Sequence, residues 1–432
     1  MIARIQPAPL AGTVPAIASK SMAHRMIIAA ALADAPTRVA CDTTCEDIEA
    51  TARCLRALGA RVERDGGAYD IEPVLQGAAV RGAVLDCGES GSTLRFMLPV
   101  ACALGADATF TGARRLGERP ISPLTDELIA GGCEVDGVGS FPLTVSGPLR
   151  PGRFELPGDV SSQYISGLLL ACSVMDRPSE IWVSGAIESR PYVNLTLKVL
   201  DMFGVPSEAI SGQAPDGGRL TVFRVQGGGF RSPGRVAVEG DWSNAAFWLC
   251  AGALGGSPIT VDGLDLASPQ GDRTILGALS RFGARIVRST GSATVVPERL
   301  VGFDLDARDV PDLVPVIAAV ASCAEGATRI RNCGRLRLKE SDRLQTTTET
   351  LRALGASIEI SGDDLLIEGR ERLAGGSVAS HNDHRITMMA AVAATRCERP
   401  VEIRGAEAVA KSYPAFFDHY RLLGGSVETL EG

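Results

Sequence analysis

The strongest constraint on the fold of this chain is a short phrase that recurs six times. An apolar helix end is followed by a glycine and then by small or β-branched residues, as in L-R-A-L-G-A-R-V at Leu55–Val62 and L-R-A-L-G-A-S-I at Leu351–Ile358. The glycines at its centre are Gly59, Gly132, Gly204, Gly283, Gly355 and Gly424. Each phrase predicts a helix that ends at a left-handed glycine and leads into a strand. Units of roughly seventy residues bury too little surface to be stable alone, so we expect the six to share cores.

A second element recurs upstream of each glycine: a polar turn that opens directly into an apolar helix. The six turns begin at Ser19, Cys87, Gly158, Gly240, Asp309 and His381. Ser, Asp and Asn are the preferred residues for capping a helix N-terminus, so each turn predicts a helix start. Every unit is therefore expected to contain a turn and helix, a strand, a second helix that ends at the glycine, and further strands.

Three units precede residue 235 and three follow it, which predicts an α/β protein of two similar domains. We expect the first domain to span residues 14–238. The second is expected to be discontinuous and to comprise residues 1–13 and 239–432. If the N-terminal strand pairs with the second half, the chain crosses between the domains twice and forms a two-strand hinge.

Composition excludes several classes of protein. The 432 residues carry a net charge of −8, which argues against a protein that coats nucleic acid or an anionic membrane. The N-terminus lacks a signal-peptide pattern, and no uninterrupted apolar run is long enough to span a bilayer. Eleven cysteines at irregular spacing indicate reduced thiols, so we expect a cytoplasmic protein.

Basic residues stand where helices are predicted to begin. Lys20 and Arg25 lie in the first unit and Arg385 in the sixth. A cation at a helix N-terminus opposes the helix dipole, so a chain that places cations there is expected to use them on a bound anion. For His24 and Arg95, pairing with a local carboxylate is an equally good explanation.

Further charged stretches interrupt the second half. The residues from Arg335 to Leu344 alternate charge with leucine, which predicts a strand passing into a helix capped by Ser341. The tetrapeptide H-N-D-H at His381–His384 offers too few ligands for a metal site.

Nine motifs carry a resemblance to a known family. They are K-S-x-x-x-R (Lys20–Arg25), G-x-S-G-S-T-x-R (Gly88–Arg95), G-x-R-P-I (Gly117–Ile121), S-S-Q (Ser161–Gln163), S-R-P-Y (Ser189–Tyr192), V-P-D (Val310–Asp312), K-E-S-D-R (Lys339–Arg343), N-D-H-R (Asn382–Arg385) and K-S-Y-P (Lys411–Pro414). In this order they resemble the 5-enolpyruvylshikimate-3-phosphate synthases over essentially the whole chain. The resemblance implies two inverse α/β domains, each of three βαβαββ repeats.

The resemblance also implies a reaction. The enolpyruvyl group of phosphoenolpyruvate would pass to the 5-hydroxyl of shikimate 3-phosphate through a tetrahedral intermediate, with release of phosphate, in aromatic amino acid biosynthesis. Asp312 matches the family's base and Glu340 its acid, and Lys20 would share in proton transfer. The partners expected are these two small anions, with no cofactor, metal, nucleic acid or membrane, and the chain is expected to be a monomer.

Binding residues carry over motif by motif. For shikimate 3-phosphate they are Lys20, Ser21, Arg25, Ser161, Ser162, Gln163, Ser189, Asp312 and Lys339. For phosphoenolpyruvate they are Lys20, Gly91, Arg119, Gln163, Arg343, Arg385 and Lys411. Because Gly91 has no Cβ, a ligand can approach its backbone closely, and the unsubstituted glycine predicts sensitivity to glyphosate, a competitor of phosphoenolpyruvate. We expect the empty enzyme to be open and the loaded one closed.

Alternatives remain at this point. A UDP-N-acetylglucosamine enolpyruvyl transferase would share fold and donor, but it typically has a cysteine five residues before the arginine of its R-P, where this chain has Arg114. An RNA 3′-phosphate cyclase would need a basic, aromatic-bearing face, which this acidic chain lacks. An inactive anion-binding protein is disfavoured by the intact Asp312, Glu340 and Lys20. Many family members have Asn in place of Glu89, whose carboxylate could weaken anion affinity or pair with an arginine.

Overall fold

The computed structural model of the protein describes residues 1–74 and 80–430, and the chain divides into two compact units. Lys20–Val238 forms one, here called the continuous unit, and Met1–Ser19 with Glu239–Gly432 forms the other, the discontinuous unit. The first crossing thus lies between Ser19 and Lys20 rather than after residue 13. The reason is that strand β2 (Gly12–Pro15) pairs in parallel with strand β15 (Ile259–Asp262) of the discontinuous unit.

The strands of the continuous unit form three four-stranded sheets. They are β3 (Thr37–Ala40), β4 (Arg61–Asp65), β5 (Ala68–Glu72), β6 (Arg81–Asp86), β7 (Asp107–Thr111), β8 (Glu134–Asp136), β9 (Leu143–Ser146), β10 (Arg153–Pro157), β11 (Ser179–Ser184), β12 (Ser207–Gln213), β13 (Arg219–Val225) and β14 (Arg235–Ala237). The sheet orders are β14-β3-β5-β4, β6-β7-β9-β8 and β10-β11-β13-β12. The first two strands of each order are parallel and the other pairs antiparallel.

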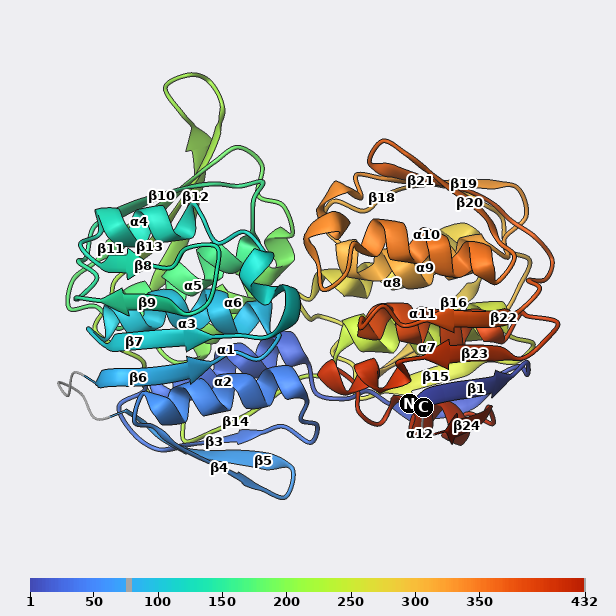
Figure 1. The fold of residues 1–432 in the computed structure, drawn as a ribbon, viewed down its shortest axis with the longest axis horizontal. Coiled ribbons are helices and arrows are strands. Elements are labelled where there is room, and N and C mark those ends of the chain that lie inside the picture. Colours follow the sequence, from blue (N-terminus) through green and yellow to red (C-terminus); the bar gives the residue numbers. More distant parts are fainter. Residues whose placement is uncertain (75–79, 431–432) are drawn as a thin grey trace. The chain divides into compact units, whose positions relative to one another are not determined.

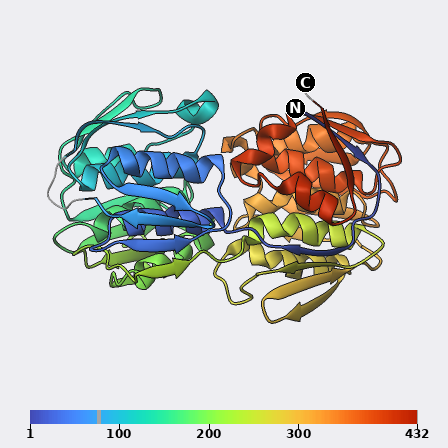
Figure 2. The same ribbon diagram turned by 90° about the horizontal axis from the view of Figure 1, so that it is seen from below.

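The discontinuous unit repeats this topology. Besides β2 and β15 its strands are β1 (Ile2–Gln6), β16 (Arg285–Ser289), β17 (Ser292–Val296), β18 (Asp304–Asp306), β19 (Ala327–Arg331), β20 (Ser357–Ser361), β21 (Asp364–Glu368), β22 (Gly376–Ala379), β23 (Val401–Arg404) and β24 (Ser426–Leu430). Their orders are β16-β17-β15-β2, β18-β19-β21-β20 and β22-β23-β1-β24. The blue N-terminal strand β1 therefore lies among red C-terminal strands (Figures 1 and 2). The expected α/β fold with three repeats in each half is confirmed.

The first helix of each repeat is central to its unit. These helices are α1 (Lys20–Ala31), α3 (Gly91–Ala103), α5 (Ser162–Ser173), α7 (Trp242–Leu254), α9 (Val314–Ala321) and α11 (His384–Ala394). In α7 every residue except Ser243 is buried, and α9 and α11 are buried throughout. Figure 1 shows α7, α9 and α11 running between the sheets of the discontinuous unit. Helices that are apolar on all sides are expected in such a position.

The second helix of each repeat ends at the recurring glycine, as predicted. These helices are α2 (Glu46–Ala57), α4 (Leu124–Ala130), α6 (Arg190–Met202), α8 (Ile275–Phe282), α10 (Arg343–Ala353) and α12 (Phe416–Leu422). All six glycines have positive φ, from +67° at Gly204 to +116° at Gly283. The left-handed conformation lets the chain leave the helix and enter the next strand without a clash from a Cβ.

Short 3₁₀ helices lie between several of these elements. They are η1 (Arg114–Glu118), η2 (Gly271–Thr274), η3 (Pro311–Leu313), η4 (Gly334–Leu338) and η5 (Ala406–Lys411). The strand expected from Arg335 is wrong, because those residues form η4. Ser341 does not cap α10 either. Asp342 does so by accepting a hydrogen bond from the Gln345 N–H, while the Ser341 hydroxyl donates to Asp383. No helix in the described ranges has the length and hydropathy to cross a bilayer.

Candidate functional site

The predicted site residues fall into two clusters, one in each unit. In the continuous unit they lie on α1, at the starts of α3 and α5, after η1 and before α6, and we call this set the helix-start cluster: Lys20, Ser21, Arg25, Gly91, Arg119, Ser161, Ser162, Gln163 and Ser189. Lys20, the first residue of α1, forms an ion pair with Asp47 in the first turn of α2, with 2.7 Å between Nζ and Oδ2. Both side chains keep some exposure, 16% and 13%. The ammonium is thus held at a helix start by a carboxylate that the sequence analysis had missed.

Gly91 opens α3 and lies against two guanidinium groups. A Cβ built at this position would be 2.6 Å from Nη1 of Arg119 and equally close to Nη1 of Arg95. Arg95 donates hydrogen bonds to the carbonyls of Gly91 and Pro120, and its guanidinium lies 5.8 Å from the ring centre of Tyr164. The Nε of Arg119 is buried and has no hydrogen-bond partner among the described residues. The absence of a side chain at Gly91 therefore lets Arg119 reach the start of α3.

The start of α5 is built from a run of hydroxyls. Ser161 caps the helix and accepts from the backbone N–H of Gln163 at 3.3 Å. The Gln163 side chain donates to the hydroxyl of Ser92 at 3.0 Å, which ties the starts of α5 and α3 together. Ser189, next to α6, has φ of +55°, a conformation that is uncommon for a residue with a side chain. Strain of this kind is concentrated at binding sites.

Arg25 is 2% exposed and bridges three helices. Its Nε donates to Thr196 of α6 at 2.7 Å, its Nη1 to the Ser21 carbonyl at 2.6 Å, and its guanidinium lies 4.8 Å from the ring centre of Phe96. Burial lowers the pKa of Arg25 to about 9. In this structure the predicted ligand-binding arginine is thus engaged with its own unit.

His24 is buried beside Arg25 and bonds a hydroxyl. Its Nδ1 lies 2.7 Å from the Thr51 Oγ1. Burial first, and then the charges of Lys20 and Arg25, hold the pKa of His24 well below its usual value. The imidazole is therefore neutral at physiological pH.

The cluster in the discontinuous unit is organised by Arg343, which opens α10 and is 1% exposed. Its Nη1 lies 2.9 Å from Asp312 Oδ1, its Nη2 lies 2.5 Å from Glu340 Oε2, and its Nε lies 2.9 Å from Asp383 Oδ2. We call the set Asp312, Lys339, Glu340, Arg343, Asp383 and Arg385 the carboxylate cluster. Both carboxylates predicted to be catalytic therefore share one guanidinium.

Within the carboxylate cluster, burial and the neighbouring charges shift the pKa values in opposite directions. Burial alone would lower the pKa of Arg343, but the carboxylates of Asp383, Glu340 and Asp312 raise it above its usual value. Burial would likewise raise the pKa of Asp383, but Arg343 holds it below its usual value. Charge-assisted, multiply hydrogen-bonded pairs of this kind can offset the cost of desolvation. Each partner thus shifts the pKa of the other toward its charged form.

Asp312 receives two further cations. Lys339 Nζ lies 3.2 Å from Oδ1 and Arg385 Nη2 lies 3.3 Å from Oδ2. Burial lowers the pKa of Lys339, and the neighbouring Asp312 partly offsets that effect. Lys411, at the end of η5, is 5% exposed and donates to the Asn382 carbonyl at 2.7 Å. Lys339 and Arg385 thus contact the predicted base directly, while Lys411 lies beside Asn382 at the start of α11.

Some functional groups carried little signal in the sequence. Asp383 appears there only as a helix cap in N-D-H-R, and its pairing with Arg343 spans 40 residues. Ser243 accepts a hydrogen bond from Arg385 Nη2 at 2.7 Å, although the two lie 142 residues apart. Asp383 and Ser243 both lie in recurring turns, so the repeats could have indicated that these two residues contribute to the site. The Glu89 carboxylate, which was expected either to weaken anion affinity or to pair with an arginine, forms an ion pair with Arg114 at 3.0 Å.

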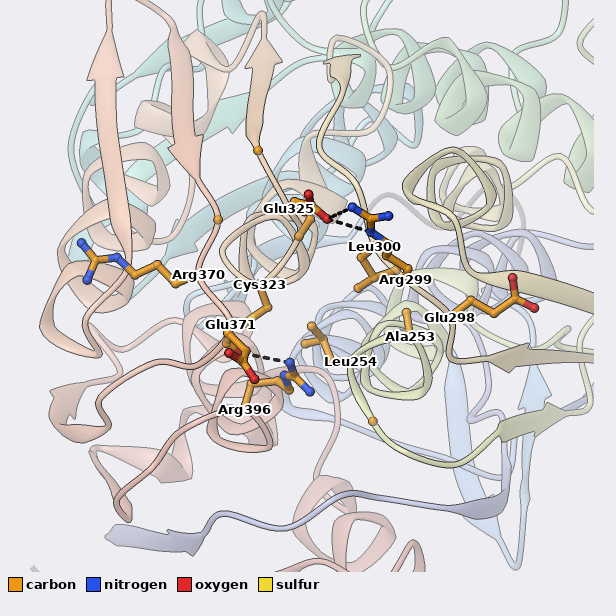
Figure 3. A pocket seen from close by; sticks show the side chains of 14 residues that line it. Ala253, Leu254, Glu298, Arg299, Leu300, Cys323, Glu325, Arg370, Glu371 and Arg396 are labelled. Atoms are coloured by element: carbon orange, nitrogen blue, oxygen red, sulfur yellow. Dashed lines mark hydrogen bonds and ion pairs between the residues drawn. The ribbon is translucent and has the colours of Figure 1, made fainter.

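A cavity of about 410 Å³ lies at the opposite, C-terminal ends of helices in the discontinuous unit (Figure 3). It is lined by Leu254 of α7, by Cys323 and by charged side chains. Arg299 Nε pairs with Glu325 at 2.7 Å, and Arg396 donates to the Glu371 carbonyl. Arginines beside helix C-termini complement the negative end of the helix dipole. The cavity contains none of the predicted site residues.

Comparisons with known proteins show which family the chain resembles over nearly its whole length. A family model described as EPSP synthase (3-phosphoshikimate 1-carboxyvinyltransferase) matches residues 5–420. The 3-phosphoshikimate 1-carboxyvinyltransferase of Clostridium kluyveri is 40% identical over 428 residues, which cover 98% of this chain and 97% of that protein. The enzyme of the same name from Clostridioides difficile is 36% identical and covers 98% of both chains. An EPSP synthase structure from Acinetobacter baumannii is similar with a TM-score of 0.79 and 25% identity, over 99% of this chain and all of that one.

Proposed function

Since the chain belongs to the EPSP synthase (3-phosphoshikimate 1-carboxyvinyltransferase) family, we infer that it transfers the enolpyruvyl group of phosphoenolpyruvate to the 5-hydroxyl of shikimate 3-phosphate and releases phosphate. The observation that carries this inference is the carboxylate cluster, in which Asp312 and Glu340 are held by one buried arginine. The reaction needs one group that removes a proton and one that donates a proton, and two carboxylates can fill these roles.

We propose that Asp312 is the base. It would take the proton of the 5-hydroxyl as that oxygen attacks C2 of phosphoenolpyruvate. Its neighbours Lys339, Arg343 and Arg385 keep the carboxylate ionised, because adjacent cations favour the charged form. Lys20 shares in proton transfer in this proposal, and its partner Asp47 would hold the ammonium in place.

Glu340 is proposed to protonate C3, which gives the tetrahedral intermediate; loss of a C3 proton and of phosphate then completes the exchange. The contact between Glu340 and Arg343 favours the ionised carboxylate, which is the wrong state for an acid. An incoming phosphoenolpyruvate would compete with Glu340 for Arg343. Binding of this substrate would therefore release Glu340 from its cation and favour its protonated form.

We propose that the two substrates are bound by the residues that match the family's motifs. Phosphoenolpyruvate would be held by Lys20, Gly91, Arg119, Gln163, Arg343, Arg385 and Lys411. Shikimate 3-phosphate would be held by Lys20, Ser21, Arg25, Ser161, Ser162, Gln163, Ser189, Asp312 and Lys339. The Arg119 Nε without a partner among the described residues supports its role, since a buried donor gains most from an anionic acceptor. Arg25 would have to exchange some of its present hydrogen bonds for the ligand.

The cellular setting belongs to the same proposal. The eleven cysteines are free thiols, which supports a reducing compartment such as the cytoplasm. Both clusters are built from a single chain, which supports action as a monomer. Light scattering coupled to size-exclusion chromatography tests the monomer directly.

Phosphate release from phosphoenolpyruvate, measured with and without shikimate 3-phosphate, tests the proposed function. We expect release only with both substrates, and none when UDP-N-acetylglucosamine replaces shikimate 3-phosphate. Asp312→Ala and Glu340→Ala should each lower kcat by at least about a hundredfold, the usual size of a general acid–base contribution. The matched control is Glu325→Ala, which removes an exposed carboxylate of the same unit and should turn over normally. Release with the nucleotide sugar, or without any acceptor, would contradict the proposal.

A further inference from the structure

A fourth carboxylate lies beside the carboxylate cluster and has no part in the mechanism above. Asp272, in η2, is 3% exposed and accepts a hydrogen bond from the Ser243 hydroxyl. The same hydroxyl accepts from Arg385 Nη2 at 2.7 Å, and Arg385 in turn lies 3.3 Å from Asp312 Oδ2. A continuous path thus runs from Asp272 through Ser243 and Arg385 to Asp312.

We propose that Asp272 is a positioning residue for the proposed base. Through Ser243 it holds the guanidinium of Arg385 against Asp312, and its negative charge strengthens Asp312 as a proton acceptor. The inference rests on the proposed function, because it concerns the base of that reaction. It assigns a role to a residue that none of the nine motifs contains.

The orientations of the Ser243 hydroxyl and the Arg385 guanidinium follow from which groups donate hydrogen bonds and which accept them. Ser243 has one hydroxyl hydrogen, which goes to Asp272, so its oxygen faces Arg385 as an acceptor. Arg385 also donates from Nη1 to the Asp312 backbone carbonyl at 3.0 Å. Its guanidinium is therefore fixed on one side by η3 and on the other by α7. Without Asp272, the Ser243 hydroxyl could rotate and donate elsewhere.

The charge of Asp272 is not needed to hold its loop in place. Gln270 already anchors the loop to the start of α7: its Oε1 accepts from the Trp242 N–H at 3.1 Å and its Nε2 donates to the Gly240 carbonyl at 2.8 Å. An asparagine would satisfy Ser243 equally well at position 272. Burying a carboxylate instead costs free energy, so a role that uses its charge accounts for the residue better than packing does.

The groups that face Asp272 come from three elements. Asp241 and Ser243 belong to the start of α7, Asp312 to η3, and Arg385 to the first turn of α11. Burial, then the charge of Asp312, raise the pKa of Asp272 to about 6, while Arg385 and Ser243 oppose the rise. Two neighbouring carboxylates each make it harder for the other to lose its proton. The charge at position 272 should therefore influence where Asp312 titrates.

The first test is the pH profile of kcat/KM for phosphoenolpyruvate in Asp272→Asn, a variant that keeps shape and hydrogen bonding but removes the charge. We expect the acid limb to move to lower pH by about half a unit to one unit, because the neighbouring negative charge is lost. At the plateau we expect kcat to fall roughly three- to tenfold, because a weaker base accepts the proton less readily.

Ser243→Ala keeps the carboxyl group at position 272 but removes its hydrogen-bond donor. Asp272 should then keep its proton to higher pH, so its negative charge is missing where Asp312 titrates and the acid limb should move to lower pH by less than in Asp272→Asn. Arg385 loses an acceptor, so KM for phosphoenolpyruvate should rise more than KM for shikimate 3-phosphate. Ser243→Thr keeps the hydroxyl and should restore the wild-type limb.

The inference and the proposed function fail differently. If the wild type releases no phosphate with both substrates, the proposed function is wrong. If the wild type turns over and both variants keep its acid limb, or move it to higher pH, the role of Asp272 is overturned. Ser243 is only half-buried, so Ser243→Ala remains a decisive test even if Asp272→Asn does not fold.

Discussion

At the level of single residues, Gly91 shows how a missing side chain can shape an anion site. Its backbone lies against Arg119 and Arg95, and a Cβ there would meet both guanidinium groups. We predict that Gly91→Ala displaces the Arg119 guanidinium and raises KM for phosphoenolpyruvate about tenfold, or ~1.4 kcal/mol. Inhibition by glyphosate should weaken in parallel, since it competes for the same position.

Steady-state kinetics with and without glyphosate measures this effect. Gly152→Ala is a suitable control, because a Cβ at Gly152 meets nothing within 4 Å. A Gly91→Ala enzyme with unchanged KM and unchanged inhibition would show that Arg119 does not act through this contact.

His24 gives a prediction about stability. Its folded-state pKa is depressed by burial and by Lys20 and Arg25, so as the pH falls below about 6.5 the unfolded chain binds a proton that the folded chain does not. The free energy of unfolding should therefore fall with pH below that value, by up to about 1.4 kcal/mol per unit from this group. Urea unfolding at pH 7.5 and 5.5 measures the slope.

The slope should be smaller in His24→Asn, which can still bond Thr51. His381→Asn, at an exposed position with φ of +51°, should keep the wild-type slope, because asparagine tolerates that conformation. Equal slopes in all three proteins would exclude His24 as the source.

Some site residues could be predicted from the sequence and others could not. The cations at helix starts could be recognised because a cation at a helix N-terminus opposes the helix dipole and is therefore unusual there. The partners of Arg343 could not, since the contact with Asp383 spans 40 residues and depends on how two repeats pack. The same limit hid Asp272, which lies in a turn without any repeated phrase.

At the level of elements, the six glycines bring the helices to an end, and they differ in what surrounds them. Gly59 has φ of +97° and open space around a built Cβ, whereas at Gly283 the Cβ would overlap the Arg299 carbonyl oxygen. Gly59→Ala should destabilise the protein by about 1–2 kcal/mol, the cost of left-handed backbone. Gly283→Ala should cost distinctly more, because backbone must also move.

Urea unfolding of both variants provides the comparison, and each serves as the other's control. An equal loss of unfolding free energy in the two variants would mean that the backbone around Arg299 can move without an energetic cost. Helices and their ends were well predicted because glycine and cap signals are local. The stretch from Arg335 was not, since alternating leucines also suit the 3₁₀ turn η4.

At the level of the whole molecule, each unit carries three sheets of its own, and the chain passes between the units twice. The continuous unit lies in one stretch of sequence. We predict that residues 20–238, expressed alone, unfold cooperatively in urea, because the strands and helices of their sheets are all present. The fragment should release no phosphate, because Asp312 and Glu340 lie in the other unit.

Circular dichroism during urea titration and the phosphate assay measure these two properties. A fragment that lacks a cooperative transition would show that the continuous unit depends on the rest of the chain. The repeats predicted the two halves correctly, but the first crossing lies later than expected because the pairing of β2 with β15 is not visible in so short a strand.

The position of β1 bears on how the protein is made. This strand pairs with β23 on one side and β24 on the other, so its register is completed by residues as late as Leu430. A ribosome synthesises the chain from the N-terminus, and the first apolar strand must therefore wait unpaired while nearly every other residue is added. Chaperone binding to the emerging N-terminus would protect it during that interval, whereas all strands of the continuous unit are present once Val238 has been added.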